Sequence, residues 1–207
     1  MKQQWELPFG ASYLGSSQCR FRVWAPCSNK VELLLMTPQE RLLPMERGES
    51  GYYELTVDGV DPGTLYRYRL DGIISRPDPA SRSQPQGVHG PSQVVDPGFD
   101  WSDGSWIGPQ LSNYIIYELH AGTFSAEGTF DAIIAHLDEL QDLGITAIEL
   151  MPVAQFPGDR NWGYDGVFPF AVQSSYGGPG GLKRLVNGLP STWYSGRIGC
   201  GLQPFGP

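Results

Sequence analysis

The sequence lacks long hydrophobic runs, has few cysteines and carries little positive charge. No apolar stretch in its 207 residues approaches the length of a membrane span, and the N-terminal MKQQWE lacks a signal-peptide core. Only 3 cysteines occur, without CxxC spacing, which argues against a disulfide scaffold or metal site and favours a reducing cytoplasm. Lys and Arg number 14 against 22 acidic residues, and they form no cluster. Nucleic acid and membrane surfaces are therefore poor partners, whereas a neutral substrate is compatible.

Glycine and proline are abundant, at 27 and 18 residues, which favours β-structure with tight turns. Short strand-like runs lie between about residues 10 and 95, at 19–25 (CRFRVWA), 31–36 (VELLLM), 51–57 (GYYELTV) and 65–70 (LYRYRL). The first run alternates, which places Phe21 and Val23 on one face. An Asp71-Gly72 turn follows the last run. This pattern predicts a β-sandwich of immunoglobulin type over residues 1–95, with most aromatic side chains in its core.

Residues 76–98 have no periodicity and are rich in proline and glycine. We therefore expect an extended, ordered connection here, with the linker between two domains at residues 96–112.

The second domain, at residues 113–187, begins like a parallel α/β fold. Residues 114–119 (YIIYEL) and 145–151 (ITAIELM) predict two strands, the first of them buried on both faces. Between them Thr129 is a plausible N-cap for one helix that Gly144 ends. The apolar residues of that helix are spaced by three or four: Phe130, Ile133, Ile134, Leu137, Leu140 and Leu143. A long loop and the opening of a helix at 181–186 follow.

Three motifs in this second domain carry a family resemblance. Residues 117–124 (YELHAGTF), 149–153 (ELMPV) and 161–167 (NWGYDGV) look like the first third of the α-amylase-type barrel. Residues 21–26 (FRVWAP) are similar to the starch-binding-like module that precedes this barrel in branching and debranching enzymes. The resemblance covers about residues 10 to 187. It implies a β-sandwich followed by the truncated start of a (β/α)8 TIM barrel.

Residues 78–92 (DPASRSQPQGVHGPS) closely resemble the linker of maltooligosyltrehalose trehalohydrolases. That family implies hydrolysis of the α-1,4 bond beside the trehalosyl end of maltooligosyltrehalose, an α-glucan, in the cytoplasm, with no metal or organic cofactor. One alternative is a glycogen branching enzyme, although such enzymes usually carry Gln where Asp165 stands. The other alternative is a free carbohydrate-binding module, which an exposed pair of aromatics on one sandwich face would favour.

The resemblance also assigns substrate-binding residues. It implies that Tyr164 stacks on the glucose ring at the cleavage subsite, that Asp165 hydrogen-bonds its hydroxyls, and that Trp162 shapes the same rim. For Glu118 and His120 we expect a structural role at the end of a strand. Retaining glycosidases need two carboxyl groups about 5 Å apart. The resemblance places the nucleophile Asp, the acid Glu and a further Asp beyond residue 207, so we expect no catalytic residue and no activity in this chain alone.

The resemblance stops after Asn187. Residues 188–204 (GLPSTWYSGRIGCGLQP) can be encoded by codons that, read after removal of one base, give ACHQHGIVVGLDVVYN and a following His. That product contains a helix end, a buried strand and the family motif DVVYNH. We therefore expect residues 188–207 to be an out-of-frame tail caused by an inserted base or a sequencing error.

Overall fold

The computed structural model describes residues 8–102 and 110–189, and the chain divides into two compact units between Pro97 and Gly98. Each unit is described by itself. The predicted tail lies outside the described residues except for Gly188 and Leu189, the first of which is the last residue of a helix.

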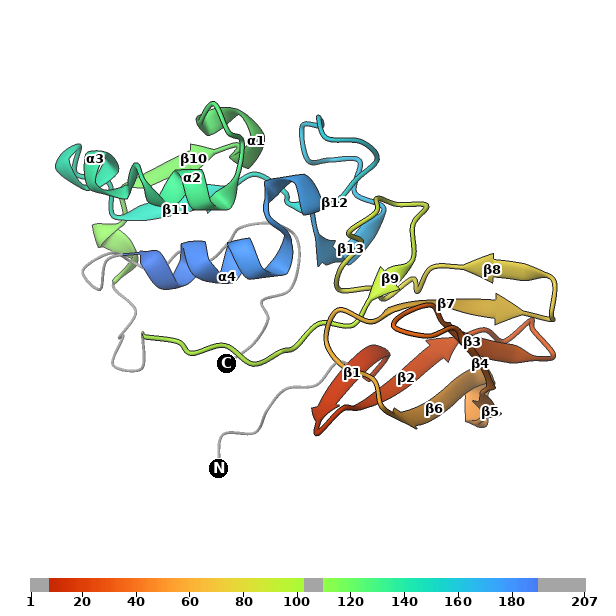
Figure 1. The fold of residues 1–207 in the computed structure, drawn as a ribbon. Coiled ribbons are helices and arrows are strands. Elements are labelled where there is room, and N and C mark those ends of the chain that lie inside the picture. Colours follow the sequence, from red (N-terminus) through yellow and green to blue (C-terminus); the bar gives the residue numbers. More distant parts are fainter. Residues whose placement is uncertain (1–7, 103–109, 190–207) are drawn as a thin grey trace. The chain divides into compact units, whose positions relative to one another are not determined.

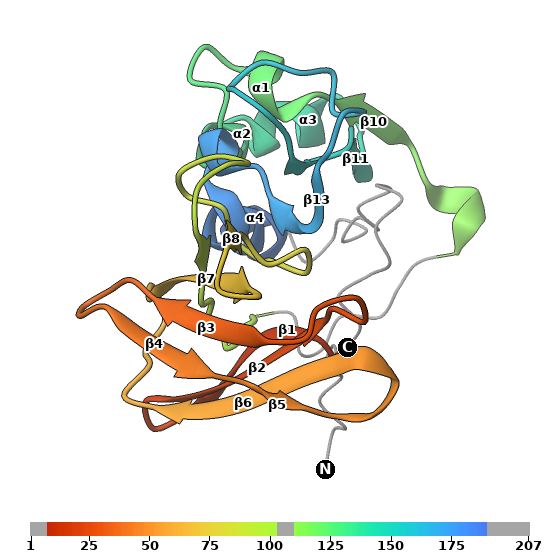
Figure 2. The ribbon, with the colours of Figure 1, turned by 90° about the vertical axis from the view of Figure 1, so that its right-hand side faces the viewer.

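The first unit is a sandwich of two antiparallel sheets (Figures 1 and 2). One sheet has the order β1-β2-β6-β5, formed by Gly10–Gly15, Gln18–Trp24, Tyr52–Asp58 and Glu46–Arg47. The other has the order β4-β3-β7-β8, formed by Arg41–Pro44, Val31–Leu35, Leu65–Leu70 and Ile74–Arg76. The short strand β9, Ser92–Gln93, pairs with β7, and the 3-10 turn Glu49–Gly51 precedes β6. The predicted sandwich is therefore confirmed.

The inward faces of the two sheets form the core of the sandwich. Phe21 and Val23 are buried together, as their alternation predicts, and Phe21 packs edge-on to Tyr66 with ring centroids 5.0 Å apart. Val31, Leu33 and Leu35 alternate in the same way on β3. Among the aromatics of the sandwich that the structure describes, Trp24 is the exposed one, because its side chain points outward and is 60% exposed.

The expectation of an extended connection at residues 76–98 is wrong over most of its length, because the segment folds onto the sandwich. Asp78, Ser81, Gln84 and Ser92 are fully buried, and β9 adds a strand pairing. Asp78 accepts a hydrogen bond from the Tyr66 hydroxyl at 2.7 Å, and its backbone N–H donates to Ser92 Oγ at 2.9 Å. Several of these polar side chains hydrogen-bond one another, although the buried Gln84 Oε1 has no partner among the described residues. An apolar periodicity cannot reveal such a cluster.

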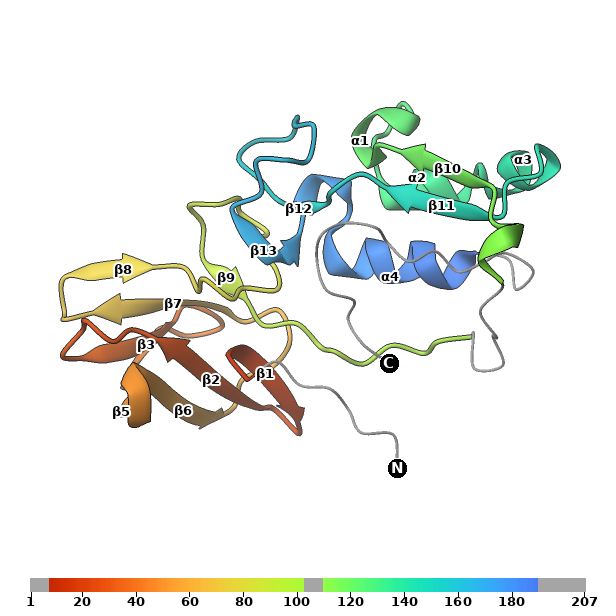
Figure 3. The same cartoon turned by 180° about the vertical axis from the view of Figure 1, so that it is seen from behind.

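The second unit contains a parallel βαβ arrangement, as predicted (Figure 3). Strand β10, Ile116–Leu119, pairs in parallel with β11, Ala147–Leu150. The helices α1, α2 and α3, at Ala121–Phe124, Phe130–Ile134 and Leu137–Asp142, connect them. The elements that follow are β12 (Ala154–Gln155), β13 (Phe168–Val172), a 3-10 turn (Ser174–Tyr176) and α4 (Gly178–Gly188). A further 3-10 turn, Leu111–Asn113, precedes β10.

The single helix predicted between Thr129 and Gly144 is wrong, because the chain forms two short helices. Thr129 caps α2 as expected, its hydroxyl accepting from Ala132 N–H at 3.3 Å, but the backbone leaves helical geometry at His136. Leu143 then lies beyond the end of α3 and is 70% exposed rather than part of the apolar stripe. Gly144 follows with a φ of +88°, which suits glycine at a helix end.

The prediction that residues 114–119 are buried on both faces is also wrong. Ile115 and Ile116 are 56% and 55% exposed, and among the described residues β10 pairs only with β11. The loop expected after residue 151 contains the antiparallel pair β12 and β13, which the sequence analysis did not predict. Helix α4 packs beside α2 (Figures 1 and 3), and Arg184 on α4 binds both carboxylate oxygens of Asp131 at 2.8 and 2.7 Å.

Candidate functional site

The candidate site lies at the carboxyl ends of β10 and β11, the edge where (β/α) barrels carry their functional loops. The two strands are in register from Ile116 opposite Ala147 to Leu119 opposite Leu150, so they end together. The N–H of Met151 donates to the Leu119 carbonyl at 2.9 Å, which extends the pairing by one residue. Residues just after either strand are therefore neighbours.

His120 follows β10 directly and holds the loop that carries the candidate residues. Its Nε2 lies 2.7 Å from the Asn161 carbonyl oxygen, and because a carbonyl only accepts, Nε2 carries a proton and donates. Its Nδ1 lies 3.2 Å from Thr123 Oγ1. The Tyr176 hydroxyl is 3.3 Å from Nε2, and the two rings meet edge-on at 5.9 Å. His120 thus has a structural role, fastening the loop to the strand end.

Asn161 organises the loop internally. Its Oδ1 accepts from Gly163 N–H at 2.8 Å, and its Nδ2 donates to Asp165 Oδ2 at 3.0 Å. The Asp165 carboxylate is thereby fixed through one oxygen. Its other oxygen has no hydrogen-bond partner among the described residues, and the residue is exposed.

Gly163 sets how closely the loop approaches the strand end. Its φ is +99°, and a Cβ there would lie 2.4 Å from the Pro152 carbonyl oxygen. Only glycine combines that backbone conformation with so close an approach. Gly166 is similarly close, because its Cβ would lie 2.8 Å from that of Ala154.

Two buried glutamines anchor the base of the loop. Gln173 accepts from Phe156 N–H at 3.0 Å and donates to the Gly158 carbonyl at 2.9 Å. Gln155 accepts from Ser174 N–H at 3.0 Å. The sequence analysis missed both residues, because a polar side chain in an unperiodic segment carries no sign of burial.

Trp162 and Tyr164 point away from these anchors into solvent. Their side chains are 81% and 72% exposed, on either side of Gly163. The loop therefore presents two aromatic faces and the carboxylate of Asp165. Its backbone is anchored by His120 at Asn161 and by Gln173 at Gly158. Aromatic faces pack against the C–H faces of a sugar and a carboxylate accepts from its hydroxyls, so this arrangement suits a neutral carbohydrate.

The other groups predicted from sequence are placed as follows. Glu118 is exposed on β10, Glu149 is half-buried within β11, and Asp159 is exposed in the loop. Of the cysteines, Cys19 is buried and Cys27 is exposed, and both are free, while Cys200 lies outside the described residues. Burial raises the pKa of the Cys19 thiol to about 12. Within the described ranges, no three His, Cys, Asp or Glu side chains gather as a metal-ion group, and no helix is long and apolar enough to cross a membrane.

Residues 8–79 match carbohydrate-binding module 48, the isoamylase N-terminal domain. A crystal structure from Salmonella typhimurium, described as an α-amylase candidate, is 43% identical with a TM-score of 0.84 and covers 92% of this chain and 32% of its own. Over the matched residues the chain is thus similar to α-amylase-type proteins, and its sandwich matches a carbohydrate-binding module.

A malto-oligosyltrehalose trehalohydrolase from Saccharolobus solfataricus is 50% identical over 167 residues, 81% of this chain and 29% of that protein. A 1,4-alpha-glucan branching enzyme from Xanthomonas oryzae is 33% identical over 81% of this chain and 26% of its own length. Over the shared residues the chain is similar to malto-oligosyltrehalose trehalohydrolases, at 41–50% identity, which confirms the resemblance drawn from its motifs. It spans about 29% of the length of that relative.

Proposed function

We propose that this chain is the front part of a retaining glycoside hydrolase that releases trehalose from maltooligosyltrehalose. In this proposal Tyr164 stacks on the glucose ring at the cleavage subsite, Asp165 accepts hydrogen bonds from its hydroxyls, and Trp162 forms the rim. The observation that carries the proposal is the exposure of Trp162 and Tyr164 beside a fixed Asp165 at the carboxyl edge of a parallel strand pair.

The catalytic carboxyl groups are proposed to lie in a part of the enzyme that this chain does not contain. The chain by itself then binds but does not cleave, because loss of nucleophile and acid typically costs many orders of magnitude in rate. We expect no trehalose above the blank when the purified chain is incubated with maltooligosyltrehalose. Trehalose production that Asp165→Ala abolishes would overturn this part of the proposal.

Binding tests the aromatic platform separately from catalysis. Calorimetric titration with maltooligosyltrehalose should show weaker binding for Tyr164→Ala and Trp162→Ala. Trp24→Ala is a matched control, since it removes an aromatic side chain of 60% exposure from the sandwich. If only Trp24→Ala weakens binding, the assignment of the loop fails.

That control also tests a second candidate function, glucan binding by the sandwich alone. Trp24 lies opposite Tyr52 on neighbouring strands, and its indole N–H donates to the Ser50 carbonyl at 3.0 Å. The Arg22 guanidinium carbon lies 4.5 Å from the centre of the Tyr52 ring. Tyr52 is half-buried beneath that guanidinium, so Trp24 is the exposed member of the pair. If the sandwich is the binding module, Trp24→Ala would abolish glucan binding and Tyr164→Ala would leave it unchanged.

A full-length enzyme gives the kinetic test. Removal of one base at codon 188, with the genomic continuation restored, should yield a trehalose-releasing hydrolase. In that enzyme Tyr164→Ala should lower kcat/KM about 10- to 1000-fold with a fall in kcat, because stacking on a distorted ring acts most strongly in the transition state. DNA that encodes no further barrel would refute the out-of-frame tail, and an unchanged Tyr164→Ala enzyme would refute the subsite.

A further inference from the structure

The two strands of the α/β unit bring two carboxylates side by side. Glu118 on β10 lies directly opposite Glu149 on β11 in the parallel register. Neighbouring strands lie about 4.7–4.9 Å apart, so side chains at one level of the register share a narrow space. Like charges at such a separation repel each other. Neither glutamate forms an ion pair within the described residues, so no cation there offsets the repulsion.

Both glutamates lie on the face of the strands that the helices leave uncovered. Leu119 and Leu150, which are also opposite one another, belong to the core that the strands share with helices α2 and α3. Side chains alternate along a strand, so Ile116, Glu118 and Glu149 lie on the other face. Ile116 is 55% exposed there, and Glu118 is also exposed. This face therefore combines exposed apolar surface with two negative charges that lack a cation.

The edges of the strand pair are open as well. In the part of the chain that the structure describes, β10 and β11 pair only with each other. The outward N–H and C=O groups of both strands are therefore available to a further strand. Backbone pairing at such an edge provides affinity, and the side chains beside it determine which partner fits.

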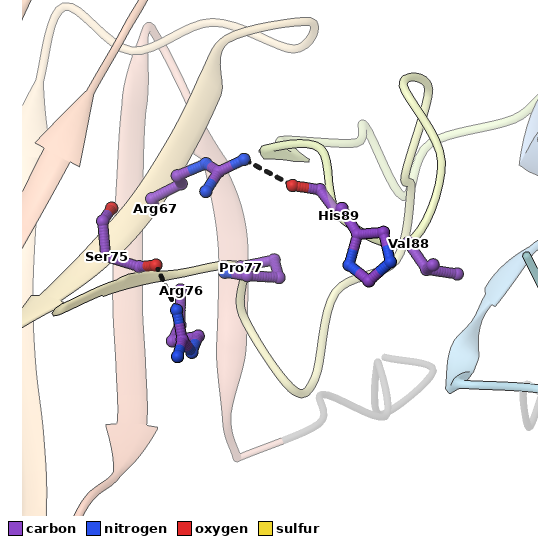
Figure 4. A pocket seen from close by; sticks show the side chains of 6 residues that line it. All are labelled: Arg67, Ser75, Arg76, Pro77, Val88 and His89. Atoms are coloured by element: carbon purple, nitrogen blue, oxygen red, sulfur yellow. Dashed lines mark hydrogen bonds between the residues drawn. The ribbon is translucent and has the colours of Figure 1, made fainter.

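The sandwich shows how this chain accommodates a carboxylate on a sheet when cations lie beside it. Glu32 on β3 is buried, and its two oxygens lie 2.8 Å from Lys30 Nζ and 2.8 Å from Arg69 Nη2. A further arginine of that unit, Arg67, donates to the His89 carbonyl (Figure 4). A buried carboxylate is thus matched by neighbouring cations in one unit, whereas the paired glutamates of the other unit have no such neighbour among the described residues.

We propose that this face docks a polypeptide that adds strands to the pair and places a Lys or Arg side chain between Glu118 and Glu149. The cation offsets the repulsion of the two carboxylates, and apolar side chains of the added strands cover Ile116. The chain spans about 29% of the length of the Saccharolobus solfataricus relative, so the rest of that protein has the length to supply such strands.

A second copy of this chain does not have the chemistry that the face requires. It would bring four carboxylates together, and each copy has a net charge of −8. The inference goes beyond the proposed function, because it concerns the face of the strands and not the sugar loop, and its tests measure association and not turnover.

Association with a defined probe tests the proposal. The probe is the part of the Saccharolobus solfataricus malto-oligosyltrehalose trehalohydrolase beyond its match with this chain, expressed separately. Mixed with the full chain, it should form a complex in size-exclusion chromatography, with a Kd that biolayer interferometry measures. Glu118→Gln and Glu149→Gln should each raise that Kd about tenfold or more, because each leaves the docked cation with one carboxylate fewer. Asp138→Asn removes a charge from α3, on the helix side of the strands, and should leave the Kd unchanged.

The same two variants separate docking from folding. In the free chain each removes one of two repelling charges, so the Tm of the α/β unit should stay the same or rise while the complex is weakened. A residue with only a structural role would not change the two measurements in opposite directions.

Three outcomes would overturn the proposal. No complex at about 10 μM probe would refute the docking face. An unchanged or lower Kd for both glutamine variants would show that no cation lies between the carboxylates. A dimer of the chain alone that Ile116→Asp disrupts would make a second copy the occupant. Tyr164→Ala should bind the probe as the parent chain does, so a failure of the sugar loop is distinguishable from a failure of this face.

Discussion

The two units of this chain differ in how completely each buries its own strands. In the sandwich Val31, Leu33 and Leu35 of the central strand β3 are all fully buried between the sheets. In the α/β unit β10 is short and pairs only with β11 among the described residues, and Ile115 and Ile116 are more than half exposed.

The difference follows from the architecture of each unit. Two antiparallel sheets cover one another's apolar faces, so a sandwich needs no further layer. A parallel sheet is covered on both faces and extends to further strands, which a two-stranded pair lacks. We therefore propose that the sandwich folds independently, whereas the α/β unit depends on additional barrel strands for its stability.

Matched truncations of one phenylalanine per unit are the strongest test of this independence. Phe21 and Phe130 are both fully buried, the first in the sandwich and the second in the α/β unit. Substituting either by Ala should cost its own unit about 3–5 kcal/mol and leave the other unchanged. Hydrogen exchange followed residue by residue would measure both units at once. A single cooperative transition that both variants shift equally would contradict the comparison.

Limited proteolysis tests the independent stability of the sandwich without a substitution. If the sandwich alone is independently stable, brief digestion should leave a resistant fragment of roughly 10 kDa, near the usual domain size. The fragment should retain the N-terminal strands when it is identified by mass. Resistance of the full-length chain would argue that both units are equally stable.

Gly163→Ala tests how strongly the binding loop is tied to the α/β unit. The new Cβ would meet the Pro152 carbonyl, so we expect a loss of about 1–3 kcal/mol in that unit. Gly158→Ala is the control, because its φ is also positive at +77° but no atom lies within 4 Å of the added Cβ. Equal Tm values for the two variants would show that the contact with Pro152 has no energetic weight.

The N-cap of α2 should contribute less to the stability of the α/β unit than the close contact at Gly163 does. Thr129→Ala removes the acceptor for Ala132 N–H and should destabilise the α/β unit by about 1 kcal/mol. Thr129→Ser keeps a hydroxyl at the same position and should stay near the parent. Chemical denaturation monitored by far-UV circular dichroism distinguishes them, and an equal loss in both variants would rule out capping as the cause.

Asp78 should give the sandwich a pH dependence opposite in sign to that of Asp131 in the α/β unit, because the hydrogen bond from Arg184 lowers the pKa of Asp131. Burial raises the pKa of this carboxyl, despite hydrogen bonds from Tyr66 and from Ala80 N–H. The native state thus binds the proton more tightly than the unfolded chain does. The free energy of unfolding should fall as pH rises from about 4 through the raised pKa, and then level off.

The Asp78→Asn variant checks that slope. It should flatten the pH profile of sandwich unfolding over this window, because the substituted side chain does not titrate. Unfolding of the α/β unit, measured in the same samples, is the internal reference. A slope that persists in the variant would assign the pH dependence to other groups.

The sequence predicted those parts of the fold in which one local rule decides the outcome. Alternation placed Phe21 and Val23 inward, and the Thr129 cap and the Gly144 stop bounded the helical region. The sequence analysis failed where contacts between distant residues determine the local structure. Nothing in the spacing of apolar residues shows that the helix breaks near His136.

The candidate site was predictable only in part, for a similar reason. Motif resemblance pointed to Trp162, Tyr164 and Asp165, whose exposure the structure describes. The hydrogen bonds that fix their loop join His120 to Asn161, 41 residues apart in the chain. A polar contact between distant segments has no periodic signature, so it requires coordinates.

The buried cluster around Asp78 also provides an optical reporter for the sandwich. Burial, followed by the nearby charge of Asp78, raises the pKa of Tyr66 and of Tyr68 well above the ordinary value. In alkaline solution these two phenols stay protonated while the sandwich is folded, and they ionise when it opens. Burial also raises the pKa of Tyr176 in the α/β unit. Phenolate absorbance gained in step with unfolding therefore reports on the sandwich through two phenols and on the α/β unit through one, without an added dye.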